Sequence, residues 1–315
     1  MRLQAEKRWP RGALSRIWGR EVLCALLPNR PLKPIRRTQS MTDQIEVLSR
    51  IADALERLAP PPVAQVDWLA HPAYVWTGSE ARGVPELLAP PLDLLRGIDS
   101  QKERVVGNVE RLAAGHAAHD MLLWGSRGMG KSAVMRASIR AAQAAHPGRI
   151  ALVQVAQEAL HGVTALFALL GKVDRQFLVF IDDLGFEEND GAGPRLLRSW
   201  LEGGVEARPN NVRLAVTANR RAIVSRSMSE QDDPINARDV VDDRLALADR
   251  FGLSIGFHNC DQPSYLSIIE GYTQQFGLSF DEHDALEWSR RRGARSGRVA
   301  WQYVTEVAGR AGKVI

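Results

Sequence analysis

The 315-residue sequence has few of the features that mark secreted or membrane-spanning proteins. It contains only two cysteines, Cys24 and Cys260. Two cysteines offer neither a disulfide framework nor a CxxC metal pair, so we expect a reducing compartment. No apolar run approaches the roughly 20 residues that a membrane-spanning helix needs. These absences predict a cytoplasmic protein that makes no use of a membrane.

Acidic residues are scarce at the N-terminal end only. Residues 1–40 contain 10 of the 41 Lys and Arg but just two acids, Glu6 and Glu21. Subtracting them from the totals of 41 basic and 37 acidic residues leaves 31 and 35 for the remainder, which is mildly acidic. The overall charge of +4 is therefore no signature of nucleic-acid binding. Because residues 1–40 also lack a periodic apolar pattern, we expect a disordered N-terminal extension, with Met41 as the natural start.

The segment 41–96 is predicted to hold a helix, a linker and an irregular stretch. The helix has apolar residues at helical spacing, namely Ile45, Leu48, Ile51, Leu55 and Leu58. The prolines of "APPPVAQ" end it and form the linker. Tryptophans and further prolines follow without a regular pattern, so we expect a small irregular segment packed on the next domain.

From residue 97 onward, short apolar runs alternate with helical patterns. The runs cover residues 120–125, 149–155, 176–183, 212–219 and 253–258. The helical patterns between them cover Lys131–Ala145, Gln157–Leu170, Gly193–Gly203 and Asp239–Arg250. Nearly continuous apolar runs are typical of strands buried on both faces of a parallel sheet. The alternation predicts a three-layer α/β core over residues 97–258 with a five-stranded parallel sheet. Residues 259–315 show three helical patterns, the first capped by Asp261, so we expect an all-helical C-terminal part.

The first of these runs leads into a glycine-rich turn, "GSRGMGKS", at residues 125–132. This is the GxxxxGKS pattern known as Walker A. Its glycines allow backbone N–H groups to turn inward around phosphate oxygens, and the helix that follows adds its positive dipole end. Lys131 is expected to reach the β- and γ-phosphates and the Ser132 hydroxyl to ligate Mg²⁺. A predicted strand before the pattern and a predicted helix after it favour this interpretation over a chance glycine-rich turn.

A second signal is the acidic pair that ends "FLVFIDD". Asp182 and Asp183 come directly after a buried run, at the carboxyl end of a strand, where ligands of open α/β sheets bind. We expect Asp182 to belong to the Mg²⁺ shell and Asp183 to orient or deprotonate an attacking water. Together the two signals predict a site for ATP and Mg²⁺.

The sequence resembles the AAA+ ATPase superfamily, and within it a bacterial family of predicted ATPases known as a domain of unknown function (family 815). The likeness runs from about Trp68 to the C-terminus and is carried by "LLRGIDSQKERVVGNVERLAAG", "MLLWGSRGMGKSAV", "FLVFIDDLGFEE", "LEGGVEARPNNVRLAVTANRR" and "ALADRFGLSIGFHNCDQPSYL". The resemblance implies a P-loop core with a helical lid and a homo-oligomer. It also implies that ATP turnover remodels or loads a protein or nucleic-acid partner, whose identity the resemblance does not give.

The resemblance also implies roles for residues outside the two signals. Gly97 and Ile98 would lie along the adenine, and Asn219 matches sensor 1, which contacts the γ-phosphate or the water. Arg250, with Arg244 as a rival, matches the arginine finger that acts on a neighbouring subunit. In the lid, "SGRVA" resembles sensor 2. The expected nucleotide contacts are Ile98, Gly125, Ser126, Arg127, Gly128, Met129, Gly130, Lys131, Ser132, Ala133 and Arg298.

One departure from the family pattern keeps alternatives open. Most AAA+ proteins have glutamate at the position of Asp183. Aspartate is one methylene shorter, and misplacement on the order of 1 Å can cost about 10²-fold in rate. Slow hydrolysis, a nucleotide-gated scaffold, and a catalytic base supplied by Glu187 are therefore all compatible with the sequence. A P-loop kinase or other phosphotransferase is a further class of function that the sequence leaves open, although no acceptor-binding insertion stands out between the predicted strands.

Overall fold

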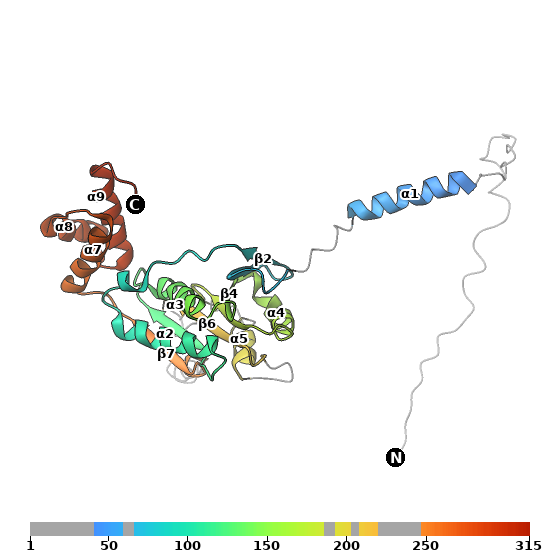
Figure 1. Cartoon of the computed structure of the whole chain (residues 1–315), viewed down its shortest axis with the longest axis horizontal. Helices are drawn as coiled ribbons and strands as arrows, with labels where there is room; N and C mark the ends of the chain where they lie inside the picture. The colour runs from blue at the N-terminus through green and yellow to red at the C-terminus, as the bar shows by residue number, and fades with distance from the viewer. Residues whose placement is uncertain (1–40, 59–65, 186–192, 203–207, 220–246) are drawn as a thin grey trace, which may run out of the picture. The chain divides into compact units, whose positions relative to one another are not determined.

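The computed structural model describes residues 41–58, 66–185, 193–202, 208–219 and 247–315 (Figure 1). The chain divides into two compact units, Met1–Val63 and Ala64–Ile315. In the first, the described part is the helix α1 (Met41–Leu58), as the sequence predicts. The expectations for residues 1–40, for Glu187 and for Arg244 lie outside the described residues. The expected domain boundaries at residues 97 and 258 stay predictions.

The second unit is built on a seven-stranded sheet with the order β2-β1-β4-β5-β6-β3-β7. Its strands are β1 (Ala73–Trp76), β2 (Ala81–Val84), β3 (Met121–Gly125), β4 (Ile150–Val155), β5 (Gln176–Ile181), β6 (Val212–Ala218) and β7 (Leu253–Phe257). All neighbours are parallel except β1 and β2. The five strands from β3 to β7 match the five predicted apolar runs, so the α/β class and the parallel core are confirmed.

The predicted strand count of five is wrong by two, because β1 and β2 arise from the stretch expected to be irregular. These strands have four residues each, too few for a clear pattern beside prolines. A buried arginine attaches the segment to the sheet. Arg175 Nη1 donates to the carbonyl oxygens of Trp68 at 2.9 Å and His71 at 2.8 Å, and Nη2 donates to that of Ile150 at 3.1 Å. Only the tertiary structure brings these partners together.

Helices cover both faces of the sheet and produce the expected three layers (Figure 1). On one face, α2 (Asp99–Ala113) and α3 (Lys131–Ala145) bury their apolar stripes against strand residues such as Leu123 and Phe180. On the other, α4 (Val163–Leu170) and α5 (Gly193–Glu202) pack on alternate strand residues such as Leu122 and Val179. The single helix expected at 157–170 is instead a 3₁₀ helix, η2 (Gln157–Gly162), followed by α4.

The C-terminal part is all helical, as predicted. It consists of α7 (Gln262–Phe276), α8 (Glu282–Arg292) and α9 (Gly297–Arg310), which share a small apolar core around Tyr265 and Tyr303. Each helix has a side-chain N-cap, from Asp261, Asp281 and Ser296 respectively. The α7 helix also packs on η1 (Leu92–Leu94), which precedes α2. We call α7–α9 the lid.

Within the described residues, no helix combines the length and the apolar content needed to cross a membrane.

Candidate functional site

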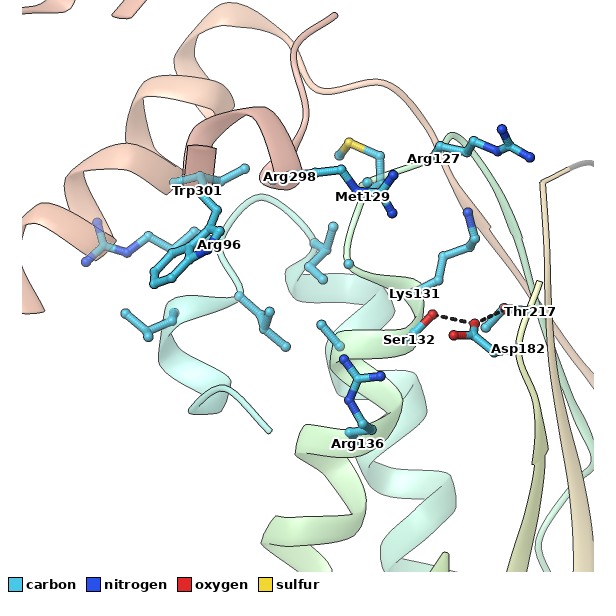
Figure 2. A pocket seen from close by; sticks show the side chains of 18 of the residues that line it. Arg96, Arg127, Met129, Lys131, Ser132, Arg136, Asp182, Thr217, Arg298 and Trp301 are labelled. Atoms are coloured by element: carbon cyan, nitrogen blue, oxygen red, sulfur yellow. Dashed lines mark hydrogen bonds between the residues drawn. The ribbon is translucent and has the colours of Figure 1, made fainter. Parts of the chain in front are cut away.

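A cavity of about 640 Å³ lies at the carboxyl ends of β3, β5 and β6, between the sheet and the lid (Figure 2). Parallel strands end at the same edge, so three motifs far apart in the sequence meet there. Figure 2 shows Lys131, Ser132 and Asp182 at one end of the cavity, and Arg96 and Trp301 at the other. We call these the phosphate end and the base end.

At the phosphate end, the last residue of β3 has to be glycine. Gly125 has a φ of +119°, and a Cβ on it would lie 2.1 Å from the carbonyl oxygen of Phe257 on β7. That same carbonyl accepts a hydrogen bond from the Ser126 N–H at 2.7 Å. Gly128 and Gly130 also have positive φ values. The loop thus adopts a backbone path closed to other residues, which is the property expected of a phosphate cradle.

Lys131 opens α3 and lies inside this loop, with a side chain that is mostly buried. Its Nζ donates to the carbonyl oxygens of Gly125 at 2.7 Å and Ser126 at 2.9 Å. Burial lowers the pKa of Lys131, and the carboxylates of Asp183 and Asp182 oppose that shift. An anionic phosphate in the loop would favour the charged ammonium further.

Ser132 and Asp182 meet through a hydrogen bond, although 50 residues separate them. The Ser132 Oγ donates to Asp182 Oδ1 at 2.5 Å, and the Thr217 Oγ1 on β6 donates to the same oxygen at 2.6 Å (Figure 2). Hydroxyl and carboxylate oxygens are the ligands that Mg²⁺ prefers beside substrate phosphates. The donor set therefore fits Mg²⁺, which Ser132 and Asp182 would hold, and the hydrogen bond from Thr217 fixes the orientation of the carboxylate.

Asp183 is in the left-handed region, with a φ of +52°. Its backbone N–H donates to Thr217 Oγ1 at 2.7 Å, which holds this turn in place. Its carboxylate accepts a hydrogen bond from Asn219 Nδ2 and lies 3.9 Å from Arg127 Nη2. Aspartate tolerates a left-handed backbone better than glutamate does. The backbone at this position thus offers a physical reason for the departure from the family's glutamate.

The base end is formed jointly by the segment around η1 and by the lid. Ile98 lines it, and so do further apolar side chains that were not predicted: Leu94, Leu95, Ile268, Tyr272 and Trp301. The rings of Tyr272 and Trp301 are edge to face, with centroids 5.0 Å apart. Trp301 is 38% exposed, whereas large aromatic side chains in the core are buried. This end offers a partly open aromatic surface suited to a flat base.

Hydrogen bonds from two arginines join the lid to the rest of the site. Arg96 lies against α7, where its guanidinium donates to Ser267 O at 3.2 Å, to Glu270 Oε2 at 3.3 Å and to Gln274 Oε1 at 3.0 Å. At the other side of the lid, the Arg298 N–H donates to the Gly128 carbonyl at 3.1 Å, and the Arg298 side chain extends from the start of α9 toward the phosphate loop (Figure 2). The position of the lid is therefore linked to the conformation of the loop.

The cavity brings together most of the residues singled out in the sequence. Those that line it are Ile98, Arg127, Gly128, Met129, Gly130, Lys131, Ser132, Ala133, Asp182, Asp183, Asn219 and Arg298. Gly125 and Ser126 do not line it, but their carbonyl oxygens accept the hydrogen bonds from Lys131. Arg250 is not among the lining residues, and its Nε pairs with the Glu202 carboxylate at the end of α5. A role of Arg250 in another copy of the chain stays a prediction.

Several residues that line the cavity were not predicted from the sequence. Thr217 had a usable signal, because it is a buried hydroxyl in a mostly apolar strand and lies two residues before Asn219. Arg136 also had one, since it lies one turn after Ser132 on the same face of α3. Tyr272 and Trp301 had none, because nothing local in the sequence separates lid residues that face the cavity from those that face the lid core. Arg96, before α2, had none either, because its partners are on α7, about 170 residues later.

A glycine loop between a parallel strand and a helix, a strand-end carboxylate bonded to the loop's serine, and a helical lid are together typical of a P-loop protein, in line with the resemblance to the AAA+ superfamily. The chain belongs to the family described as "Protein of unknown function (DUF815)", whose model matches residues 69–311. No curated protein matches the chain.

Solved structures with a similar arrangement have low sequence identity to the chain. A single-residue variant of RuvB from Thermotoga maritima is 19% identical over 72% of this chain and 68% of that chain, with a TM-score of 0.49. RuvB of the same organism, described as a Holliday junction branch migration motor, is 18% identical over the same shares, with a TM-score of 0.48. The ORC1 protein of Aeropyrum pernix, in complex with DNA, is 14% identical over 74% and 68%, with a TM-score of 0.47.

Proposed function

We propose that the chain is a Mg²⁺-dependent ATPase that assembles with further copies of itself and couples ATP turnover to the remodelling or loading of a macromolecular partner. The observation that carries the ATP chemistry is the contact of Ser132 with Asp182 beside the phosphate loop. It places a loop hydroxyl and a strand-end carboxylate where one Mg²⁺ could take both as ligands.

In the proposed reaction, the phosphate end binds the phosphates of ATP and neutralises their charge. The loop N–H groups and the start of α3 bind the phosphates, and Lys131 neutralises charge on the β- and γ-phosphates. Mg²⁺ held by Ser132 and Asp182 would add charge neutralisation between those two phosphates. Arg298 contributes a further positive charge from the lid.

In this proposal, Asp183 accepts the proton of the attacking water. Asn219 holds the Asp183 carboxylate toward the cavity, so the pair can orient a water and accept its proton. Arg250 from a neighbouring copy would add the charge that completes the site. The shorter reach of aspartate predicts slow turnover in the absence of that copy.

The short side chain of Asp183 favours one alternative, a scaffold that binds ATP and barely hydrolyses it. Product analysis on the full chain separates the candidates. Free phosphate released on assembly supports the ATPase, and tight ATP binding with no phosphate release under any condition supports the scaffold. A phosphorylated acceptor in place of free phosphate would identify a phosphotransferase.

The Mg²⁺ site can be tested with matched aspartates. Asp182→Asn keeps the shape of the side chain but removes the charge that Mg²⁺ needs, so the Mg²⁺-dependent part of ATP binding, measured by calorimetry with and without the metal, should disappear. Asp174→Asn removes an exposed aspartate outside the cavity lining and should change nothing. If Asp182→Asn retains the full Mg²⁺ dependence, the proposed site is wrong.

A further inference from the structure

The helix α1 has a division of residue types that its amphipathic character alone does not require. Numbered in heptads from Met41 at position a, it has every charged residue at b, c or f: Asp43, Glu46, Arg50, Asp53, Glu56 and Arg57. The a, d, e and g positions are apolar with the exception of Gln44. The apolar stripe thus occupies four of the seven heptad positions, which is wider than the a/d seam of a two-stranded coiled coil.

The large apolar side chains of this stripe that the structure describes, from Ile45 to Ile51, are open to solvent. Ile45 is 63% exposed, Leu48 64% and Ile51 50%. They belong to a separate unit of the chain, Met1–Val63. A helix of 18 residues gains most of its stability from packing its apolar face, because an isolated helix of this length is marginal in water. The stripe therefore requires a covering surface.

The charges of α1 argue against an anionic membrane as that surface. Helices that lie on membranes are rich in Lys and Arg on their polar face. The polar face of α1 instead has four acids and two arginines. The arginines follow acids at i,i+4 spacing, as Glu46 with Arg50 and Asp53 with Arg57, in the favourable order. Because the charges can pair within the helix, the polar face needs no charged partner.

The residues at a and d favour other copies of α1 instead. The a positions are Met41, Leu48 and Leu55, and the d positions are Gln44, Ile51 and Leu58. In the middle of the helix, Leu at a is thus combined with Ile at d, which shifts parallel coiled coils from dimers to larger bundles. Ala52 at e and Ala54 at g are small, which allows neighbouring helices to approach closely. We propose that α1 is an assembly helix, through which more than two copies of this chain associate as a helical bundle. This inference does not depend on ATP chemistry.

The test uses the full chain and two neighbouring residues. Leu48→Asp buries a charge at an a position, whereas Ser49→Asp places the same side chain at b, on the polar face. Sedimentation equilibrium without nucleotide should show a reversible oligomer of more than two copies for the parent and for Ser49→Asp. For Leu48→Asp, the concentration needed for assembly should rise at least about tenfold. Equal assembly of both variants, or a monomeric or dimeric parent at all concentrations, would overturn the proposal.

Two controls separate the helical bundle from membrane binding and from the nucleotide site. Flotation with phosphatidylserine vesicles should recover no parent chain, and recovery that Leu48→Asp abolishes would assign the stripe to a membrane and overturn the bundle. Lys131→Ala should assemble like the parent in the absence of nucleotide. If it does so but binds ATP as the parent does, the proposed function fails while the assembly helix stands. Circular dichroism melting should show that Leu48→Asp leaves the second unit folded.

Discussion

The phosphate end and the base end of the cavity are built in different ways. Each part of the phosphate end is a short contiguous motif, held at the edge of one parallel sheet by strands that are buried on both faces. The base end instead combines Arg96 and Ile98 with lid residues about 170 to 200 positions later, such as Tyr272 and Trp301. The sheet can hold the phosphate end rigid, whereas the base end changes whenever the lid moves. We therefore expect substitutions at the two ends to have separable effects on binding.

The largest effect is expected for Lys131→Ala, which removes a buried charge from the phosphate end. ATP affinity should fall by roughly 10³-fold, because loss of one partner from a buried, hydrogen-bonded charge pair costs about 2–5 kcal/mol. The affinity for inorganic tripolyphosphate, which has no base, should fall by the same factor. Calorimetry with both ligands measures this, and Lys172→Ala, at an exposed position, is the control. A parent-like affinity for either ligand would contradict the role given to the loop.

Arg250→Ala is expected to slow hydrolysis without affecting ATP binding at either end of the cavity. Hydrolysis should fall by up to about 10³-fold, while ATP affinity stays nearly unchanged because its own cavity keeps all lining residues. Mixing this variant with Lys131→Ala should restore part of the activity, since an intact arginine can then face an intact loop. Glu202→Gln tests whether loss of the ion pair alone explains the effect. Mixed assemblies without recovered activity would place Arg250 in a structural role.

Asp183→Asn should lower hydrolysis by about 10²-fold and leave ATP binding intact. Asparagine tolerates the left-handed backbone and can still contact Asn219, but it accepts no proton. Steady-state phosphate release and equilibrium binding distinguish the two effects. Asp183→Glu, which strains the backbone, should lower the melting temperature more than Asp183→Asn does. Undiminished turnover in Asp183→Asn would mean that another residue acts as the general base.

The smallest effect is expected at the base end. Trp301→Ala should lower the affinity for ATP by roughly tenfold, since stacking of a base on an aromatic side chain is worth about 1–3 kcal/mol. Its affinity for tripolyphosphate should not change, in contrast to Lys131→Ala. Leu169→Ala, another exposed apolar side chain, controls for a general loss of apolar surface. If both ligands weaken together, the two ends are not separable and the lid acts on the phosphates too.

Much of the phosphate end could be predicted from the sequence because its signals are local. The glycines and Lys131 lie in one eight-residue pattern, and the acids of "FLVFIDD" follow a strand that is recognisable from its apolar run. The core strands were predictable for the same reason, since burial on both faces leaves an unbroken apolar stretch. The short strands β1 and β2 were not, because β1 joins the sheet by pairing with β4, about 80 residues later.

The sequence by itself determined the α/β class, the parallel core, the helical C-terminal part and the glycine-rich loop that lines the cavity. Periodicity and glycine chemistry act over a few neighbouring residues, so they can be read along the chain. The tertiary structure alone decided that Thr217 orients Asp182, that Asp183 adopts a left-handed backbone, and that Tyr272 and Trp301 face the cavity. These features depend on contacts between distant segments, and such contacts exist only once the sheet has formed and the lid has packed against it.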